Sequence, residues 1–318
     1  MSEAKRTNLF MLIVILNSIF AVFLYSGIVF WLGNLGITVS TAAGLVLSQL
    51  LTQAIPFVLY MAHTKKKLTE VLPLKNPGLA NIGLIILMAI LIQPIMSFLS
   101  AFTSLFFKNN VSATVISMYT SRRSTIIGIM IISILPAVFE EFVYRGIILS
   151  GYKKAPLALK VLASGLFFGI MHMNPHQFLY AFVLGCVFAL VVHYSGSIFS
   201  SMLFHFLVNF TQSMLAAILM KFSQSLPESA EIAASTTEGS SILAAIIFTG
   251  IIAAIFVPLF ALVFVGFISH NKRCNAHEVL QEADEIEEKF KIKRVFDTPF
   301  FAVIIIFISF VFLQYFAY

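Results

Sequence analysis

Nine long apolar stretches divide this chain, and they constrain its fold more than any other feature. An α-helix needs roughly 20 apolar residues to cross the hydrocarbon core of a bilayer. The stretches are Leu9–Trp31, Thr41–Ala62, Leu79–Phe107, Thr125–Leu149, Leu157–Met173, Gln177–Tyr194, Ile198–Phe222, Ile242–Ser269 and Pro299–Tyr318. The fifth and sixth are short, and the last is compatible with a membrane-spanning or an interfacial helix. The sequence therefore predicts an all-α, polytopic transmembrane helix bundle of about eight to nine spans.

The composition fits a membrane protein and excludes several other classes. Hydrophobic residues make up 59% of the 318 positions and charged residues 11%, whereas a soluble domain carries about 25% charged residues. The net charge of +6 comes from short loops between apolar runs, so we predict no nucleic-acid partner. Cys186 lies in a span and Cys274 in a polar loop, which argues against a disulfide and against thiol catalysis.

The basic residues predict the orientation of the chain. One side of the predicted membrane receives Lys5, Arg6, Lys65, Lys66, Lys67, Lys75, Lys153, Lys154, Lys272, Arg273, Lys289, Lys291, Lys293 and Arg294. The other side receives only Lys108, Arg122, Arg123 and Lys221. Because cytoplasmic loops carry the excess of Lys and Arg, the N-terminus is expected in the cytoplasm. With nine spans, the C-terminus lies outside. The short loops fit a microbial cell membrane.

The chain falls into three parts. Residues 1–124 hold N-terminal transmembrane helices, and residues 125–222 hold the spans with the polar motifs described below. Residues 223–318 comprise a polar outer loop at Ser223–Gly239, the C-terminal transmembrane helices and a cytoplasmic amphipathic segment. That segment, Asn275–Phe296, has apolar residues at helical spacing between charges, which is typical of a helix on a membrane surface.

Three ionisable residues stand close together inside the fourth stretch. They are Glu140, Glu141 and Arg145, and each costs about 2.5–3.5 kcal/mol in a membrane span. Residues four apart share one face of a helix, so we expect Glu141 and Arg145 to form a neutralising charge pair. Glu140 points about 100° away and is free to act as a general base. Pro136 is expected to kink or break the span.

Two later spans add groups that can complete a water-activating site. His172 ends the fifth stretch, and His205 and Asn209 lie four apart on the seventh. All lie at a depth similar to that of Glu140, so one shared cavity is predicted. His176 and His193 lack such companions, and we interpret them as structural or interfacial.

The turn between the fifth and sixth stretches is predicted to be tight. Asn174-Pro175 marks the break, because Pro starts helices and disfavours helix at the preceding residue. Gly165 and Gly169 form a pair of small residues that allows a neighbouring helix to approach closely. We therefore expect a helical hairpin whose turn stays inside the membrane.

Two chemistries suit a carboxylate with histidines. In the metal-free version, Glu140 and His172 orient and deprotonate water while His205 and Asn209 donate hydrogen bonds to the oxyanion. In the second version, Zn²⁺ is bound by His172, His205 and either Glu140 or Glu141, and the remaining glutamate is the base. The spacing does not choose between a cofactor-free and a Zn²⁺ site.

These motifs together resemble those of a known family. The blocks are Glu140-Glu141-x-x-x-Arg145, Phe168-x-x-x-His172 and His205-x-x-x-Asn209. In this order and on successive spans, they resemble the CPBP family of CAAX proteases and bacteriocin-processing proteins, also called Abi, which includes the type II CAAX prenyl endopeptidases. The resemblance covers about Pro136 to Asn209.

The resemblance implies an intramembrane endopeptidase whose cavity opens toward the cytoplasm, where it cleaves a peptide bond. The implied roles are a water-activating base for Glu140, its partner for His172, an oxyanion site for His205 and Asn209, and a supporting pair for Glu141 and Arg145. The implied partners are membrane lipid and a prenylated protein or peptide. The resemblance leaves metal dependence and oligomeric state open.

Other functions stay open at this point. Within the family, the alternative to CAAX processing is bacteriocin maturation or self-immunity. Outside protease chemistry, the glutamates and histidines also suit the proton relay of a transporter, or the fold of a non-catalytic membrane adaptor.

Overall fold

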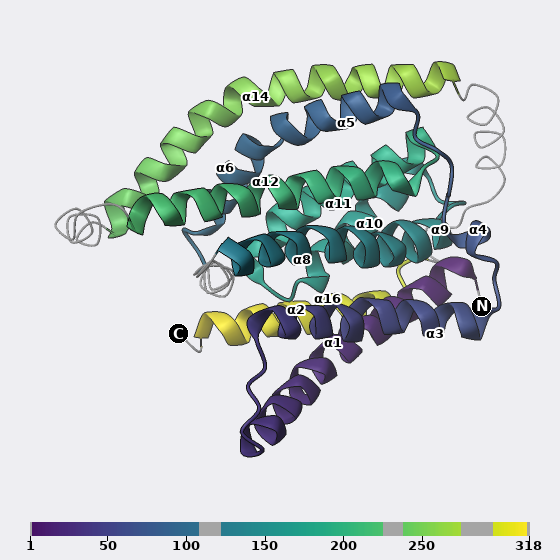
Figure 1. The fold of residues 1–318 in the computed structure, drawn as a ribbon. Coiled ribbons are helices and arrows are strands. Elements are labelled where there is room, and N and C mark those ends of the chain that lie inside the picture. The colour runs from purple at the N-terminus through teal and green to yellow at the C-terminus, as the bar shows by residue number, and fades with distance from the viewer. Residues whose placement is uncertain (1, 108–121, 225–237, 275–294, 317–318) are drawn as a thin grey trace.

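The computed structural model describes residues 2–107, 122–224, 238–274 and 295–316. These residues form helices, and their only β feature is an isolated bridge between Leu74 and Ser197. The helices are α1 (Glu3–Asn34), α2 (Thr41–Gln49), η1 (Leu50–Ala54), α3 (Ile55–Thr64), α4 (Leu68–Val71), α5 (Leu79–Leu91), α6 (Gln93–Thr103), α8 (Arg122–Glu141), η2 (Phe142–Ile148), α9 (Leu149–Gly151), α10 (Leu157–Met171), α11 (Pro175–Ser195), α12 (Ile198–Gln224), α14 (Glu238–Cys274) and α16 (Thr298–Phe316). The prediction of an all-α bundle is confirmed (Figure 1).

Eight helical segments of the described chain are long and apolar enough to cross a membrane. α16 is one of them, so the last stretch has the length of a span. α10 is shorter, as predicted for the fifth stretch. The sixth stretch was predicted to be short, but α11 has 21 residues. It is longer because the helix begins at Pro175, two residues before the apolar run.

α10 and α11 form the expected tight hairpin. The Asn174 side chain accepts hydrogen bonds from the backbone N–H groups of His176 and Gln177, and Pro175 takes the first helical position. A Cβ atom on Gly165 would lie 2.4 Å from Cys186 Sγ and 2.9 Å from the carbonyl oxygen of Phe182. Glycine at this position therefore sets the distance between the two helices.

Two spans change from α-helical to π-helical geometry halfway along. η2 continues α8, and η1 connects α2 with α3. The fourth span was predicted to kink or break near Pro136. It does not break there, because α8 continues through this residue and its regular geometry ends at Glu141. π-helical turns inside α-helices are rare and often lie at functional sites.

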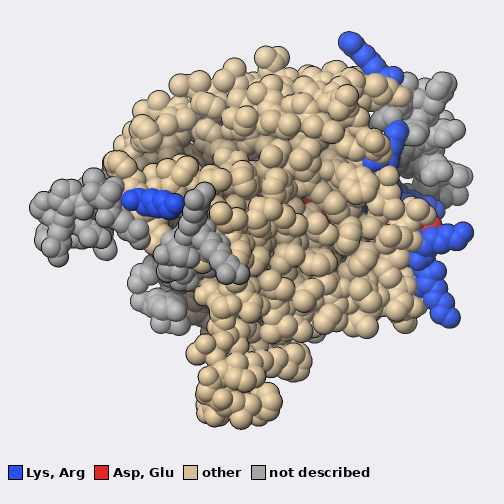
Figure 2. Space-filling model, in the orientation of Figure 1, with Lys and Arg blue, Asp and Glu red and all other residues tan. Residues whose placement is uncertain are grey.

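Successive spans run in alternating directions, so the bundle has two distinct ends (Figure 1). We call the end with the N-terminus, α4 and α9 the N-terminal end, and the other end the distal end. The C-terminus lies at the distal end. Most Lys and Arg side chains visible in Figure 2 gather at the N-terminal end, and the face shown is almost free of charge between the two ends. The predicted amphipathic segment at 275–296 lies outside the described residues except for its last two, and so does most of the predicted outer loop.

The N-terminal end is held together by polar contacts between α1 and the segment before α16. Asn8 donates hydrogen bonds to the carbonyl oxygen of Val295 and to Asp297 Oδ1, and the Tyr152 hydroxyl donates to Asn8 Oδ1. Asp297 also caps α16, because its carboxylate accepts a hydrogen bond from the backbone N–H of Phe300 at 3.0 Å. These contacts join the first and last spans.

The packing of α10 on α11 gives a test of the fold. We expect Gly165→Ala to lower the free energy of unfolding by about 1–3 kcal/mol, because the added methyl group meets backbone as well as Cys186. Gly83→Ala in α5 is the matched control, because a Cβ there has no neighbour within 4 Å. Thermal denaturation in detergent measures both variants. Equal melting temperatures for the two variants would contradict the close approach.

Candidate active site

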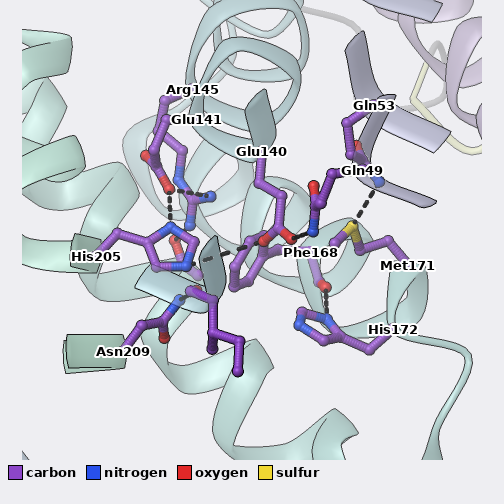
Figure 3. Close-up of polar contacts among 12 residues, drawn as sticks. Gln49, Gln53, Glu140, Glu141, Arg145, Phe168, Met171, His172, His205 and Asn209 are labelled. Carbon is purple, nitrogen blue, oxygen red and sulfur yellow. Dashed lines mark hydrogen bonds and ion pairs between the residues drawn. The ribbon is translucent and has the colours of Figure 1, made fainter. Parts of the chain in front are cut away.

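A cavity of about 920 Å³ lies among helices α2, α6, α8, α10, α11, α12 and α14. All four residues predicted to carry the chemistry line it, namely Glu140, His172, His205 and Asn209. Figure 3 shows that the Glu140 side chain points into the space between Gln49 and His205. Together with Gln49 of α2, the cavity therefore brings together polar side chains from α2, α8, α12 and the end of α10.

Glu140 is buried, with an exposed fraction of 4%. Gln49 Nε2 donates a hydrogen bond to Glu140 Oε1 at 3.0 Å, and His205 Nε2 lies 3.9 Å from Oε2. The partners of this carboxylate thus come from other helices. One carboxylate oxygen is held by an amide, and the other faces the histidine.

Glu141 and Arg145 form an ion pair of 3.0 Å inside the bundle, and both side chains are completely buried. Arg145 Nη2 also donates a hydrogen bond to the carbonyl oxygen of Gly185 at 3.1 Å. Its guanidinium lies over the rings of Phe168 and Phe188, at 4.3 and 5.1 Å from their centroids. Such cation–π contacts help to offset the loss of hydration.

His205 connects the ion pair to the cavity. Its Nδ1 lies 2.9 Å from Glu141 Oε1, and its ring stacks on Phe188 with centroids 5.0 Å apart. A carboxylate facing one ring nitrogen fixes the orientation of the ring and favours the tautomer with a proton on that nitrogen. A neutral His205 then presents an unprotonated Nε2 toward Glu140. To donate a hydrogen bond from Nε2, His205 must carry a second proton.

His172 lies directly after the last residue of α10. Its Nδ1 lies 2.8 Å from the carbonyl oxygen of Phe168. Because a carbonyl oxygen can only accept, Nδ1 carries the proton, and Nε2 of a neutral ring is left to accept one. Asn209 donates from Nδ2 to the carbonyl oxygen of Ile132, at the long distance of 3.4 Å. This weak bond leaves the Asn209 amide available for a better acceptor.

Gln49 was not predicted as a site residue, and His176 was predicted to be structural or interfacial. Gln49 and Gln53 are polar residues in an apolar span, which was the available signal. Gln53 contacts Met171 Sδ at 3.3 Å, beside His172. His176 lines the cavity as well, and its Nε2 lies 3.0 Å from Ser104 Oγ. His193 is not among the residues that line the cavity.

The Zn²⁺ alternative does not fit the arrangement of donors. In the part of the chain that the structure describes, no three or more His, Cys, Asp or Glu side chains are grouped so that they could hold a metal ion. His205 Nδ1 and Glu141 Oε1 face each other, and Glu141 Oε1 also lies against Arg145. Glu141 is therefore already paired with a cation and a histidine, which argues against the version of the site that uses it as a metal ligand.

The cavity lies on the distal side of Glu140. Its lining residues in α8 run from Ile131 to Glu140, and those in α12 run from His205 to Ala216. Two predictions, a cytoplasmic N-terminus and a cavity that opens toward the cytoplasm, require the cavity at the N-terminal end. They cannot both hold, because buried residues that follow Glu140, such as Tyr144 and Arg145, occupy that end.

The two adjacent glutamates give a test that separates structure from chemistry. Glu141→Gln leaves Arg145 without its buried counter-charge, and we expect a loss of about 3–5 kcal/mol in the free energy of unfolding. Glu140→Gln keeps an acceptor for Gln49 and breaks no ion pair with Arg145, so its melting temperature should stay close to that of the wild type. Thermal denaturation in detergent compares them, and a reversed order would contradict this assignment.

A comparison with known protein families finds a match in the part of the chain that holds the candidate site. Residues 122–211 match the family model described as type II CAAX prenyl endopeptidase Rce1-like. No curated protein and no solved structure matches. The matched segment holds Glu140, His172, His205 and Asn209, so these positions lie in a segment similar to a CAAX-type membrane endopeptidase. The match confirms, for residues 122–211, the resemblance to the CPBP family that the three sequence blocks carry.

Proposed function

We propose that this protein is an intramembrane endopeptidase in which Glu140 activates the water that attacks a peptide bond. The observation that carries this proposal is the position of the Glu140 carboxylate, which is buried, lines the cavity and lies between Gln49 and His205. An ionisable group in a membrane bundle is costly and marks function by default. The family match of residues 122–211 supports the same class of reaction.

In the proposed reaction, Glu140 and His172 share the task of preparing the water. Gln49 holds Glu140 Oε1, so Oε2 is the oxygen that takes the proton. His172, with Nδ1 bound to a carbonyl, orients the water through Nε2. The resulting hydroxide attacks the carbonyl carbon of the substrate, and Glu140 then delivers the proton to the leaving amine.

His205 and Asn209 are proposed to stabilise the oxyanion of the tetrahedral intermediate. Hydrogen-bond donors placed in advance around the developing charge are the strongest contribution in such sites. Asn209 has an amide N–H held by only a long hydrogen bond, and His205 can donate from Nε2 once both nitrogens are protonated. Glu141 lies 2.9 Å from Nδ1 and keeps the His205 ring oriented for this role. Together with Arg145, it forms the supporting pair.

We further propose that the protein lies in a microbial cell membrane with its N-terminus in the cytoplasm. The excess of Lys and Arg at the N-terminal end supports this orientation. The proposed partners are membrane lipid and a peptide or protein substrate. Within that class, a prenylated CaaX protein and a bacteriocin-like precursor are the two candidates that the family resemblance suggests.

Glu140→Gln tests the reaction. The variant removes the base and keeps the shape of the side chain, so we expect cleavage to fall by a factor of about 10²–10⁴. The measurement is the initial rate of cleavage of fluorogenic peptides, one farnesylated with a CaaX end and one unmodified, by purified protein in detergent. A rate within a few-fold of the wild type, with normal folding, would exclude Glu140 as the base.

A zinc chelator in parallel reactions addresses the metal question. In the metal-free reaction, the wild-type rate is unchanged by the chelator. A rate that falls on chelation and returns with Zn²⁺ would support the metal alternative instead. Selective cleavage of the farnesylated peptide would favour prenyl-protein processing, and cleavage of the unmodified peptide would direct the search toward bacteriocin-like precursors.

Asn209→Ala tests the oxyanion site separately. Removal of one donor from such a site costs about 10²–10³ in kcat, and we expect that loss with little change in KM. Asn209 makes only one long hydrogen bond to the bundle, so the melting temperature should change little. A higher KM with an unchanged kcat would assign Asn209 to substrate binding.

A further inference from the structure

The cavity beside Glu140 extends in one direction only. Along α8, α10 and α12, the lining residues lie between the level of the candidate catalytic groups and the distal end of the bundle. Ile242 and Ala245, in the N-terminal part of α14, and the last turns of α6 complete the lining there. α6 and α12 both end at this end of the bundle (Figure 1).

The opposite direction is blocked by packed side chains. Directly after Glu140 and Glu141, the residues Val143, Tyr144 and Arg145 are almost completely buried. Val71, the last residue of α4, and Leu72 pack against the next turn, so closely that a Cβ on Gly146 would lie 2.4 Å from Leu72 Cδ2. Ile198 and Phe204 of α12 are fully buried in the same region. A peptide cannot reach Glu140 through this end without unpacking it.

The closed end is also the positively charged end. The connections at the N-terminal end carry Lys65–Lys67, Lys75, Lys153 and Lys154. The distal end of the described chain has Lys221 and the first residues of α8. Because cytoplasmic loops carry the excess of basic residues, the closed end is the cytoplasmic one. The cavity then extends toward the outer face of the membrane.

We propose that the substrate of this site is a peptide segment that reaches Glu140 from the non-cytoplasmic face, such as the exported part of a membrane protein or a secreted precursor. This inference rests on the proposed endopeptidase function and names the side and the class of its substrate. It excludes a prenylated C-terminus presented in the cytoplasm.

The wall of the distal part of the cavity suits a peptide. It carries hydroxyl and amide side chains from three helices, namely Ser97, Ser100 and Ser104 of α6 and its end, Gln177 of α11, and Gln212 and Ser213 of α12. Backbone N–H and C=O groups of an extended substrate require such partners away from bulk water. A hydrocarbon chain would cover the same polar groups without offering any hydrogen bond.

The test first locates the cavity relative to the membrane. Cys186 and Cys274, which are both free thiols, are replaced by Ala and Ser. Single cysteines are then introduced by Ala101→Cys in the cavity, Lys221→Cys at the distal end and Lys154→Cys at the N-terminal end. A membrane-impermeant thiol reagent is applied to sealed right-side-out and inverted vesicles.

We expect the Ala101→Cys and Lys221→Cys variants to react in right-side-out vesicles, and the Lys154→Cys variant to react in inverted ones. Reaction of the Ala101→Cys variant from the same side as the Lys154→Cys variant would overturn the proposed side of entry. The proposal would also be overturned if the Lys221→Cys variant reacted in inverted vesicles and the Lys154→Cys variant reacted in right-side-out ones. This arm does not depend on activity, so it decides the direction of the cavity even if no cleavage is found.

The second arm measures on which side a substrate is cleaved. A quenched fluorogenic peptide with charged ends, which cannot cross the membrane, is added to both kinds of sealed vesicles containing the wild type. We expect cleavage by right-side-out vesicles, and latent activity in inverted vesicles that appears when detergent opens them. Cleavage by sealed inverted vesicles alone would overturn the inference and leave the protease function intact. Absence of cleavage even in detergent would instead count against the proposed function.

Discussion

The buried pair of Glu141 and Arg145 is the interaction on which the site depends. A guanidinium without a counter-charge would be too costly in this environment, and Arg145 finds its partners on three elements. It pairs with Glu141 in its own span, donates to the backbone of α11 and lies over the ring of Phe168 in α10. Glu141 in turn orients His205 of α12. One ion pair therefore contacts the three helices that carry the candidate catalytic groups, α8, α10 and α12, and joins them to α11.

Adjacent glutamates serve different purposes because consecutive residues of a helix point about 100° apart. Glu141 faces the packed core, whereas Glu140 faces the cavity and contacts Gln49 of the second span. Both spans change to π-helical geometry immediately beside these residues, after Glu141 in one and after Gln49 in the other. Such a change re-aims the side chains that follow without ending the helix. The π-helical backbone therefore begins next to the hydrogen bond between Gln49 and Glu140, which joins the two spans.

The sequence predicted the parts of this structure that depend on local spacing. The lengths of the apolar runs predicted the spans, and the four-residue spacing of Glu141 and Arg145 predicted their contact. The close approach at Gly165 followed from residue size alone. The role of Gln49 was not predicted, because nothing local to an isolated amide in a span indicates which carboxylate it meets 91 positions later. The direction of the cavity does not follow from local spacing either, since it depends on packing between α4 and η2, which are distant in sequence.

The same packing separates two physical requirements of hydrolysis in a membrane. Electrostatic interactions are strong only where water is excluded, and the ion pair lies in such a region, with both side chains completely buried. Hydrolysis also consumes water, which must reach Glu140 along a polar route. In the proposed reaction, the hydroxyl and amide groups of α6 and α12 that line the cavity provide that route on the distal side. Glu140 lies at the boundary of the two regions, where its carboxylate accepts a hydrogen bond from Gln49 and faces the cavity from which water and substrate arrive in the proposed reaction.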